Sequence, residues 1–148
     1  MNPFVLVVDD DEAIRTVMAE VLRVDGHEVL CASDGAEALA LMRCGRVPEL
    51  VVLDLMMPNV TGWQVLEAMG ESPRLAAVPV VVLTAFDARD DLPAGRPALH
   101  KPIEAALLLD LVRALLEQDR KLAFALEEAP SDLMPRPSDA HTHPAKGS

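Results

Sequence analysis

Carboxylates follow two apolar segments of the sequence at the point where each segment ends. Residues 4–8 are apolar and lead into Asp9 and Asp10, and the apolar residues 50–53 lead into Asp54. If both segments are buried parallel strands, their carboxyl ends meet at one edge of the sheet, where open α/β folds keep their sites. Carboxylates held that close repel one another, and a hard divalent cation such as Mg²⁺ is the simplest group that offsets the repulsion. The sequence therefore indicates a metal site at this edge.

A hydroxyl and an ammonium group follow two later segments in the same way. Thr84 ends the apolar run that covers 78–83, and Lys101 follows the short segment 98–100. Carboxylates, a hydroxyl and an ammonium at one edge suit phosphoryl chemistry, because the cation neutralises charge while Thr84 and Lys101 bind the remaining oxygens. A carboxylate can itself act as the nucleophile and carry an aspartyl phosphate.

The elements that must position these residues alternate along the chain. Short β-branched apolar runs predict strands, and apolar residues at three-four spacing predict amphipathic helices. The expected strands are 4–8, 28–32, 50–54, 78–83 and 98–100. The expected helices are 13–24, 35–43, one that starts at Gly62, a short or broken one within 86–95, and a last one from Ile103 through Leu116 that could reach Glu128. This alternation predicts an α/β fold with a doubly wound five-stranded parallel sheet and right-handed crossovers.

Composition narrows the class of protein. The 148 residues are 51% hydrophobic and carry a formal charge of -11, which is enough apolar material for one packed domain and argues against direct binding to nucleic acid or anionic membrane. The sequence has no apolar run of about 18 residues and no basic-then-apolar amino terminus, so we expect a cytoplasmic protein. Cys31 and Cys44 lack metal-ligand spacing and are interpreted as free thiols.

Four motifs on successive expected strand ends resemble those of a known family. They are Val7-Val8-Asp9-Asp10, Asp54-Leu55-Met56-Met57-Pro58 with Gly62, Leu83-Thr84-Ala85 and Lys101-Pro102. Each motif alone is weak, but all four in this order resemble the receiver domain of two-component response regulators, and the resemblance covers residues 3 to 118.

The resemblance implies a fold and a site. The fold is the flavodoxin- or CheY-like three-layer sandwich. Asp54 accepts a phosphoryl group, and Asp9, Asp10, Asp54 and the backbone carbonyl of Met56 hold Mg²⁺. Thr84 and Lys101 contact the phosphoryl group, and the peptide bond between Lys101 and Pro102 is expected to be cis.

The sequence departs from the family pattern at three points. Ala98 stands where receivers usually have the Tyr or Phe whose rotation reports phosphorylation. Only 17 positions separate Thr84 from Lys101, which resembles a shortened fourth helix. Met56 and Phe86 occupy the positions that modulate hydrolysis of the aspartyl phosphate, and neither can orient a water through a strong hydrogen bond. Slow loss of the phosphoryl group from Asp54 follows as a hypothesis.

Other interpretations of the same residues stay open. The acidic run that begins at Asp9 could merely cap the first helix and favour its dipole. Gly62 is expected to do no more than permit a tight turn, and Trp63 is expected to pack within its helix. The Leu-rich last helix covers more than one face, so either a homodimer forms through it or another part of the chain covers it.

We therefore expect a receiver domain in residues 1–120, an extension of the last helix in 121–128 and a disordered Pro-rich tail in 129–148, with no output domain. The expected function is that of a single-domain response regulator, phosphorylated by a histidine kinase or a histidine phosphotransfer protein and acting on a downstream protein. It is not expected to be an enzyme beyond limiting its own phosphorylation. The alternative is a phosphorylation-independent scaffold. A hydrolase ranks third, because such enzymes usually need an Asp where Met56 stands.

Overall fold

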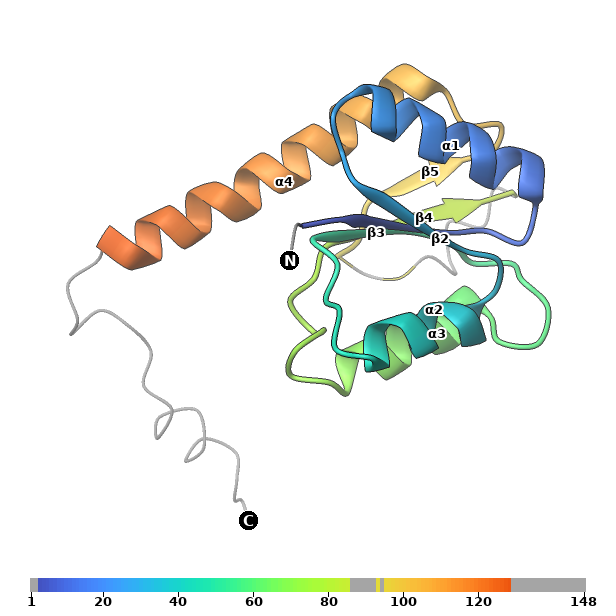
Figure 1. Ribbon diagram of the computed structural model, residues 1–148, viewed down its shortest axis with the longest axis horizontal. Helices are drawn as coiled ribbons and strands as arrows, with labels where there is room; N and C mark the ends of the chain where they lie inside the picture. The colour runs from blue at the N-terminus through green and yellow to red at the C-terminus, as the bar shows by residue number, and fades with distance from the viewer. Residues whose placement is uncertain (1–2, 86–92, 94, 129–148) are drawn as a thin grey trace, which may run out of the picture. The chain divides into compact units, whose positions relative to one another are not determined.

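Five parallel strands form the centre of the fold (Figure 1). A computed structural model describes residues 3–85, 93 and 95–128 of the chain. Its strands are β1 (Val5–Val8), β2 (Val29–Ala32), β3 (Leu50–Asp54), β4 (Val80–Thr84) and β5 (Ala98–His100). They lie in the order β2-β1-β3-β4-β5. The expected doubly wound α/β fold of the CheY type is confirmed.

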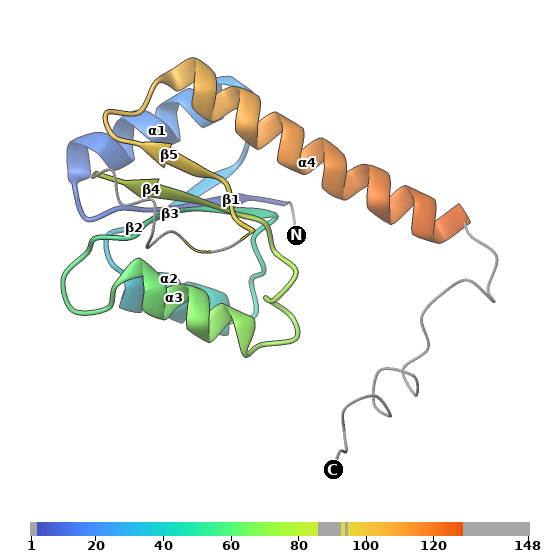
Figure 2. The same ribbon diagram turned by 180° about the vertical axis from the view of Figure 1, so that it is seen from behind.

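Helices cover both faces of this sheet. The described helices are α1 (Glu12–Val24), α2 (Gly35–Arg43), α3 (Gly62–Gly70) and α4 (Ala105–Glu128). The views in Figures 1 and 2 place α2 and α3 against one face, and α1 with the first turns of α4 against the other. The result is a three-layer sandwich in which the strand ends remain available between the helical layers.

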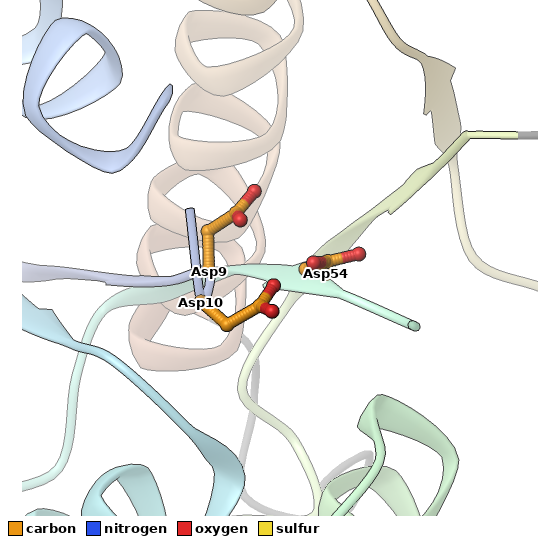
Figure 3. Close-up of side chains that lie close together, drawn as sticks. All are labelled: Asp9, Asp10 and Asp54. Atoms are coloured by element: carbon orange, nitrogen blue, oxygen red, sulfur yellow. The ribbon is translucent and has the colours of Figure 1, made fainter. Parts of the chain in front are cut away.

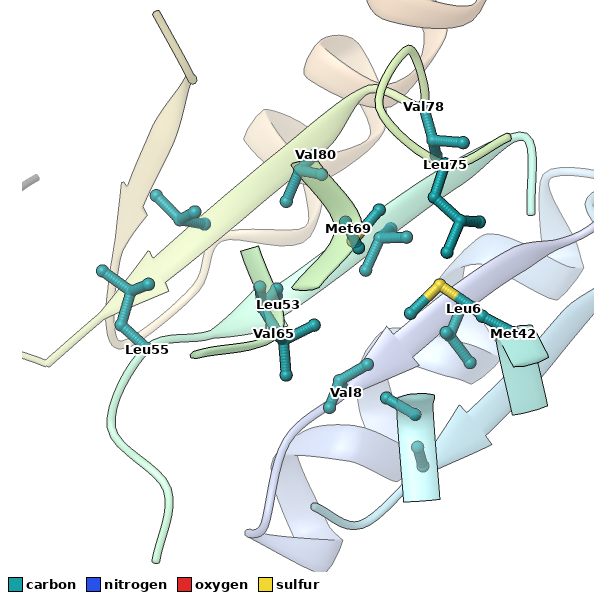
Figure 4. Close-up of a cluster of buried hydrophobic side chains, with 14 of the residues drawn as sticks. Leu6, Val8, Met42, Leu53, Leu55, Val65, Met69, Leu75, Val78 and Val80 are labelled. Carbon is teal, nitrogen blue, oxygen red and sulfur yellow. The ribbon is translucent and has the colours of Figure 1, made fainter. Parts of the chain in front are cut away.

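Burial on both faces explains the composition of the central strands. Every residue of β1, β3 and β4 is buried, which is why these strands are almost continuous runs of Val and Leu. Beneath α2 and α3 the sheet contributes to a hydrophobic cluster that includes Leu6, Leu53 and Val80 (Figure 4). The polar residues Asp54 and Thr84 are the exceptions within these strands, and both stand at the last position.

Side-chain caps start the helices just beyond the strand ends. The carboxylate of Asp11 accepts a hydrogen bond from the amide of Ile14 and begins α1. Asp34 caps α2 in the same way, and Thr61 forms a capping box with Gln64 at the start of α3. Each cap satisfies amides of the first helical turn and so fixes where the helix begins beyond the edge that carries the acidic residues.

Some element limits differ from those expected from the sequence. The strand expected from Val78 begins at Val80, because Pro79 lacks an amide N–H and the amide of Val78 instead donates to the carbonyl of Leu75 in a turn. The last helix begins at Ala105 and does reach Glu128. The short helix expected within 86–95 and the tail expected in 129–148 fall largely or wholly outside the described residues.

The chain divides into two compact units, one ending at Leu115 and the other beginning at Leu116. In the first unit, Arg113 of α4 pairs with Asp25 at the end of α1, with 3.0 Å between Nε and Oδ2. Both cysteines are free, as expected. Among the described residues, no helix has the combination of length and apolar character that a bilayer crossing requires.

Candidate functional site

Three aspartates gather at the carboxyl edge of the sheet (Figure 3). Asp9 follows β1 and Asp54 ends β3, and these strands are neighbours in parallel register with Val8 opposite Leu53. Carboxylate oxygens of Asp9, Asp10 and Asp54 all lie within 4.8 Å of one another. Asp9 is 0% exposed and Asp54 is 1% exposed, whereas Asp10 is exposed. The expected convergence of the three carboxylates is therefore confirmed.

Lys101 is the cation of this cluster. Its Nζ lies 3.0 Å from Oδ2 of Asp9 and 3.3 Å from Oδ2 of Asp54. Its amide donates to the main-chain carbonyl of Thr84 at 2.8 Å, which continues the pairing of β5 with β4 to the edge of the sheet. The peptide bond to Pro102 is cis, as the resemblance implied.

In each of the two buried carboxylates, the two oxygens have different partners. Oδ1 of Asp9 accepts a 2.9 Å hydrogen bond from the amide of Asp11, and Oδ1 of Asp54 accepts a 3.0 Å bond from the amide of Met56. The Oδ2 atoms are buried, and apart from the ion pairs with Lys101 they accept no hydrogen bond from the described residues. Carboxylate oxygens that have no contact beyond an ion pair are suitable ligands for a hard cation, so the residues present fit Mg²⁺.

Burial sets the charge state of Asp54. Its removal from water raises the pKa of the Asp54 carboxyl to about 6; the Met56 amide lowers the pKa, the Asp9 charge raises it and Lys101 lowers it. Burial works against the charge of Lys101, but the ion pairs with Asp9 and Asp54 outweigh this effect and raise the pKa of its ammonium. At neutral pH Asp54 is therefore ionised beside a protonated lysine.

The sequence matches a known protein family over most of its length. The model of the response regulator receiver domain matches residues 5–113, which contain all the acidic residues of the site and Lys101. The chain belongs to the response regulator receiver family. Asp9, Asp10 and Asp54 form the acidic triad that is typical of the receiver metal site.

Individual response regulators are also similar in sequence to this chain. The response regulator PleD of Caulobacter vibrioides is 37% identical over 120 residues, covering 78% of this chain and 26% of PleD. The response regulator MprA of Mycobacterium sp. (strain KMS) is 40% identical over 122 residues, covering 77% of this chain and 50% of MprA. The chain spans about a quarter to a half of the length of these two relatives. The structure of the chemotaxis response regulator CheY4 of Vibrio cholerae is similar with a TM-score of 0.71 at 28% identity, covering 78% of this chain and 99% of CheY4.

Three of the four remaining positions expected from the receiver pattern fall within the described residues. Thr84 is buried at the end of β4. Met56, two residues after Asp54, is 56% exposed. Ala98 opens β5, where it is partly buried and packs against the hydrophobic cluster as a small side chain. Phe86 lies outside the described residues.

Gly62 corrects one sequence-based expectation. Its φ is not in the left-handed region, so a tight turn is not the reason for glycine here. A Cβ at this position would lie 2.4 Å from the carbonyl oxygen of Asp54 and 2.7 Å from Cα of Leu55. The amide of Gly62 also donates to the carbonyl of Leu55. The glycine therefore permits the start of α3 to pack directly on the backbone of the receiver's central aspartate.

Arg15 was missed by the sequence analysis. Its Nη1 donates a 2.8 Å hydrogen bond to the main-chain carbonyl of Asp9. Long side chains on a helix point back toward its amino terminus, and Arg15 follows the helix cap Asp11 by four residues. That spacing was the signal that could have indicated a contact between Arg15 and the loop that carries Asp9 and Asp10.

Proposed function

We propose that this receiver domain accepts a phosphoryl group on Asp54 from a histidine kinase or a histidine phosphotransfer protein, in a reaction that requires Mg²⁺, and signals through protein contacts. One observation supports the proposal above all others. Oδ2 of the buried Asp54 carboxylate has the ion pair with Lys101 as its only polar contact among the described residues, and carboxylate oxygens of Asp9, Asp10 and Asp54 lie within 4.8 Å of one another.

The arrangement suits nucleophilic attack by a carboxylate. An ionised oxygen of Asp54 attacks the phosphorus of a phosphohistidine, a P–O bond forms, and the P–N bond breaks to return its electron pair to the imidazole. Lys101 offsets the charge of the phosphoryl oxygens, and the hydroxyl of Thr84 is proposed as a second contact. When bound by Asp9, Asp10, Asp54 and the Met56 carbonyl, Mg²⁺ supplies the charge neutralisation that phosphoryl transfer needs.

An apolar groove beside the pocket is proposed as the docking surface for the phosphodonor. Its volume is about 280 Å³, and it is lined by one face of α1 together with Pro102, Ile103 and Leu108. Pro102 directly follows Lys101, which pairs with Asp54. We therefore propose that an apolar helix face of the phosphodonor binds in this groove, next to Asp54. Val17 in its lining is 59% exposed. With a kinase that labels the wild type, Val17→Glu should slow transfer from the kinase and leave labelling by a small phosphodonor unchanged.

Incubation with Mg²⁺ and acetyl phosphate, followed by intact mass measurement, tests the proposed function. We expect one added phosphoryl group in the wild type and none in Asp54→Ala or in the presence of EDTA. Asp119→Ala, which changes an exposed aspartate of α4, is the matched control and should be labelled like the wild type. Absence of an adduct in the wild type would contradict the proposal, and turnover of an external phosphoester would indicate a hydrolase.

Ala98 favours a second candidate function, a scaffold that keeps the receiver fold without the phosphorylation switch. The alanine leaves no aromatic ring at this position of β5 to change orientation. A receiver that is phosphorylated on Asp54 but binds its downstream protein equally well before and after labelling would support the scaffold.

A homodimer through α4 is also part of the proposal, because Leu107, Leu122 and Phe124 of this helix are exposed.

A further inference from the structure

Arg15 of α1 forms a hydrogen bond with the preceding loop, which carries Asp9 and Asp10. It is half-buried in the first turn of α1, and its guanidinium donates to the main-chain carbonyl of Asp9 at 2.8 Å. This hydrogen bond connects the carbonyl of Asp9 to a side chain of α1. Elsewhere in the loop, Asp9 Oδ1 and Asp11 Oδ1 accept amide hydrogens of Asp11 and Ile14. The amide of Asp9 donates to the carbonyl of Ala32 at 3.2 Å, and Oδ2 of Asp9 pairs with Lys101.

We propose that Arg15 is a positioning residue for the metal site. By fixing the carbonyl of Asp9, it fixes the peptide that joins Asp9 to Asp10, and with it the direction in which both carboxylates leave the main chain. Loss of a group that orients a metal ligand typically lowers metal affinity by about 10–100-fold. This inference rests on the proposed function, because it concerns the Mg²⁺ that the same pocket would hold.

The charge of Arg15 and its hydrogen bond have opposite effects on a bound cation. A guanidinium that is hydrogen-bonded to the main chain of Asp9 adds positive charge near the site and weakens its attraction for Mg²⁺, so removal of the charge alone would strengthen binding. Loss of the hydrogen bond frees the Asp9–Asp10 peptide and weakens binding. The sign of the change therefore separates positioning from a simple effect of net charge.

The chain contains a matched control for this contact. Arg23 lies on the same helix, and its Nη2 donates a 3.1 Å hydrogen bond to the main-chain carbonyl of Val29. Val29 is paired with Val5 at the amino end of the sheet, the opposite end from Asp9. Arg23→Met removes the same charge and the same kind of bond from α1 without touching the site.

Calorimetric titration with Mg²⁺ alone, without phosphodonor, tests the proposal on wild type, Arg15→Met, Arg15→Lys and Arg23→Met. We expect Kd to rise roughly tenfold in Arg15→Met, to recover in part in Arg15→Lys, and to stay unchanged in Arg23→Met. The Mg²⁺ concentration that gives half-maximal labelling by acetyl phosphate should rise in the same proportion. Thermal unfolding in EDTA shows whether each variant is folded, and Arg15→Lys provides the comparison if Arg15→Met is not.

Equal or tighter Mg²⁺ binding by folded Arg15 variants would overturn the positioning role while leaving the proposed function intact, since the wild type would still bind and be labelled. An equal loss in Arg23→Met would also overturn it, because the effect would then belong to α1 as a whole. A wild type that binds no Mg²⁺ would overturn both proposals.

Discussion

At the scale of single residues, Asp54 shows how a reactive carboxylate costs a receiver stability. The side chain is buried at the end of β3, and burial raises its pKa to about 6, so the ionised form at neutral pH is held against an unfavourable environment. Lys101 offsets part of this cost through its ion pairs with Asp9 and Asp54. The carboxylate that would react is thus one whose charge destabilises the folded protein.

Asp54→Asn should therefore stabilise the metal-free protein in a pH-dependent way. The folded pKa of about 6 lies above the ordinary aspartate pKa of 3.8, so between these values the folded state holds a proton that the unfolded state has lost. Wild-type stability falls as pH rises through this window, and the amide variant lacks this loss. We expect a gain of about 1–2 kcal/mol at pH 7.5 in EDTA, reduced for screening by water, which shrinks toward pH 4 in thermal or urea unfolding.

Two measurements check the origin of this gain. Asp119→Asn, at an exposed position of α4, should not change stability by more than a few tenths of a kcal/mol. Added Mg²⁺ should stabilise the wild type more than Asp54→Asn, because one proposed ligand is missing in the variant. If Asp54→Asn were no more stable than the wild type at pH 7.5 in EDTA, the proposed electrostatic cost would be wrong.

Met56 leads to a prediction about the lifetime of the aspartyl phosphate. Its side chain is 56% exposed beside Asp54, but a thioether forms only weak hydrogen bonds and cannot orient an attacking water. Met56→Asn should speed hydrolysis about tenfold, equal to about 1.4 kcal/mol of barrier, in a time course of intact mass after removal of acetyl phosphate. Met56→Leu, which is also apolar, should decay like the wild type. Phe86→Glu is a second variant expected to speed decay, and unchanged decay in both polar variants would contradict the hypothesis.

At the scale of helices and strands, the sequence was most informative where one physical cause dominates. β3 and α2 have the limits expected from their patterns, because a strand buried on both faces must be apolar and Asp34 is a strong helix cap. The contact of Gly62 could not be predicted in this way. It depends on how closely a helix approaches a strand end, a distance that is set by packing of the whole sandwich and leaves no periodic signal in the sequence.

Gly62→Ala tests the close approach of α3 to β3. A methyl group would lie 2.4 Å from the carbonyl oxygen of Asp54, so either the helix or the strand end must shift. We expect a loss of about 1–3 kcal/mol in unfolding free energy, together with slower labelling of Asp54 by acetyl phosphate. Gly70→Ala is the control at the other end of the same helix, because no atom lies within 4 Å of its Cβ position. Equal effects of the two variants would refute the steric explanation.

At the scale of the whole molecule, the chain combines a strongly acidic receiver with a long last helix that leaves apolar side chains exposed. The formal charge of -11 favours partners with basic surfaces. On α4, Leu122 is 58% exposed and Phe124 is 65% exposed. These two side chains leave the helix on different sides, since they are two positions apart. Both would gain from burial against another chain.

Self-association should therefore depend on these residues. We expect light scattering to show a mass that rises from monomer toward dimer with increasing protein concentration, and Leu122→Glu with Phe124→Glu to remain monomeric. Each apolar side chain withdrawn from water contributes about 1.5–3 kcal/mol, so the double substitution should abolish association at micromolar concentrations. Glu117→Gln, a conservative change of an exposed residue on the same helix, is the control. A strictly monomeric wild type at every concentration would exclude the homodimer.

The order of the pocket's components along the polypeptide has a consequence for synthesis. A ribosome makes the carboxylates of Asp9 and Asp54 first, and their counter-charge, Lys101, only after every strand of the sheet has been made. A nascent or truncated chain that lacks this lysine would hold two buried like charges without compensation. Under the proposed function, Asp54 is therefore suited to phosphorylation only once the sheet is complete and Lys101 has been made.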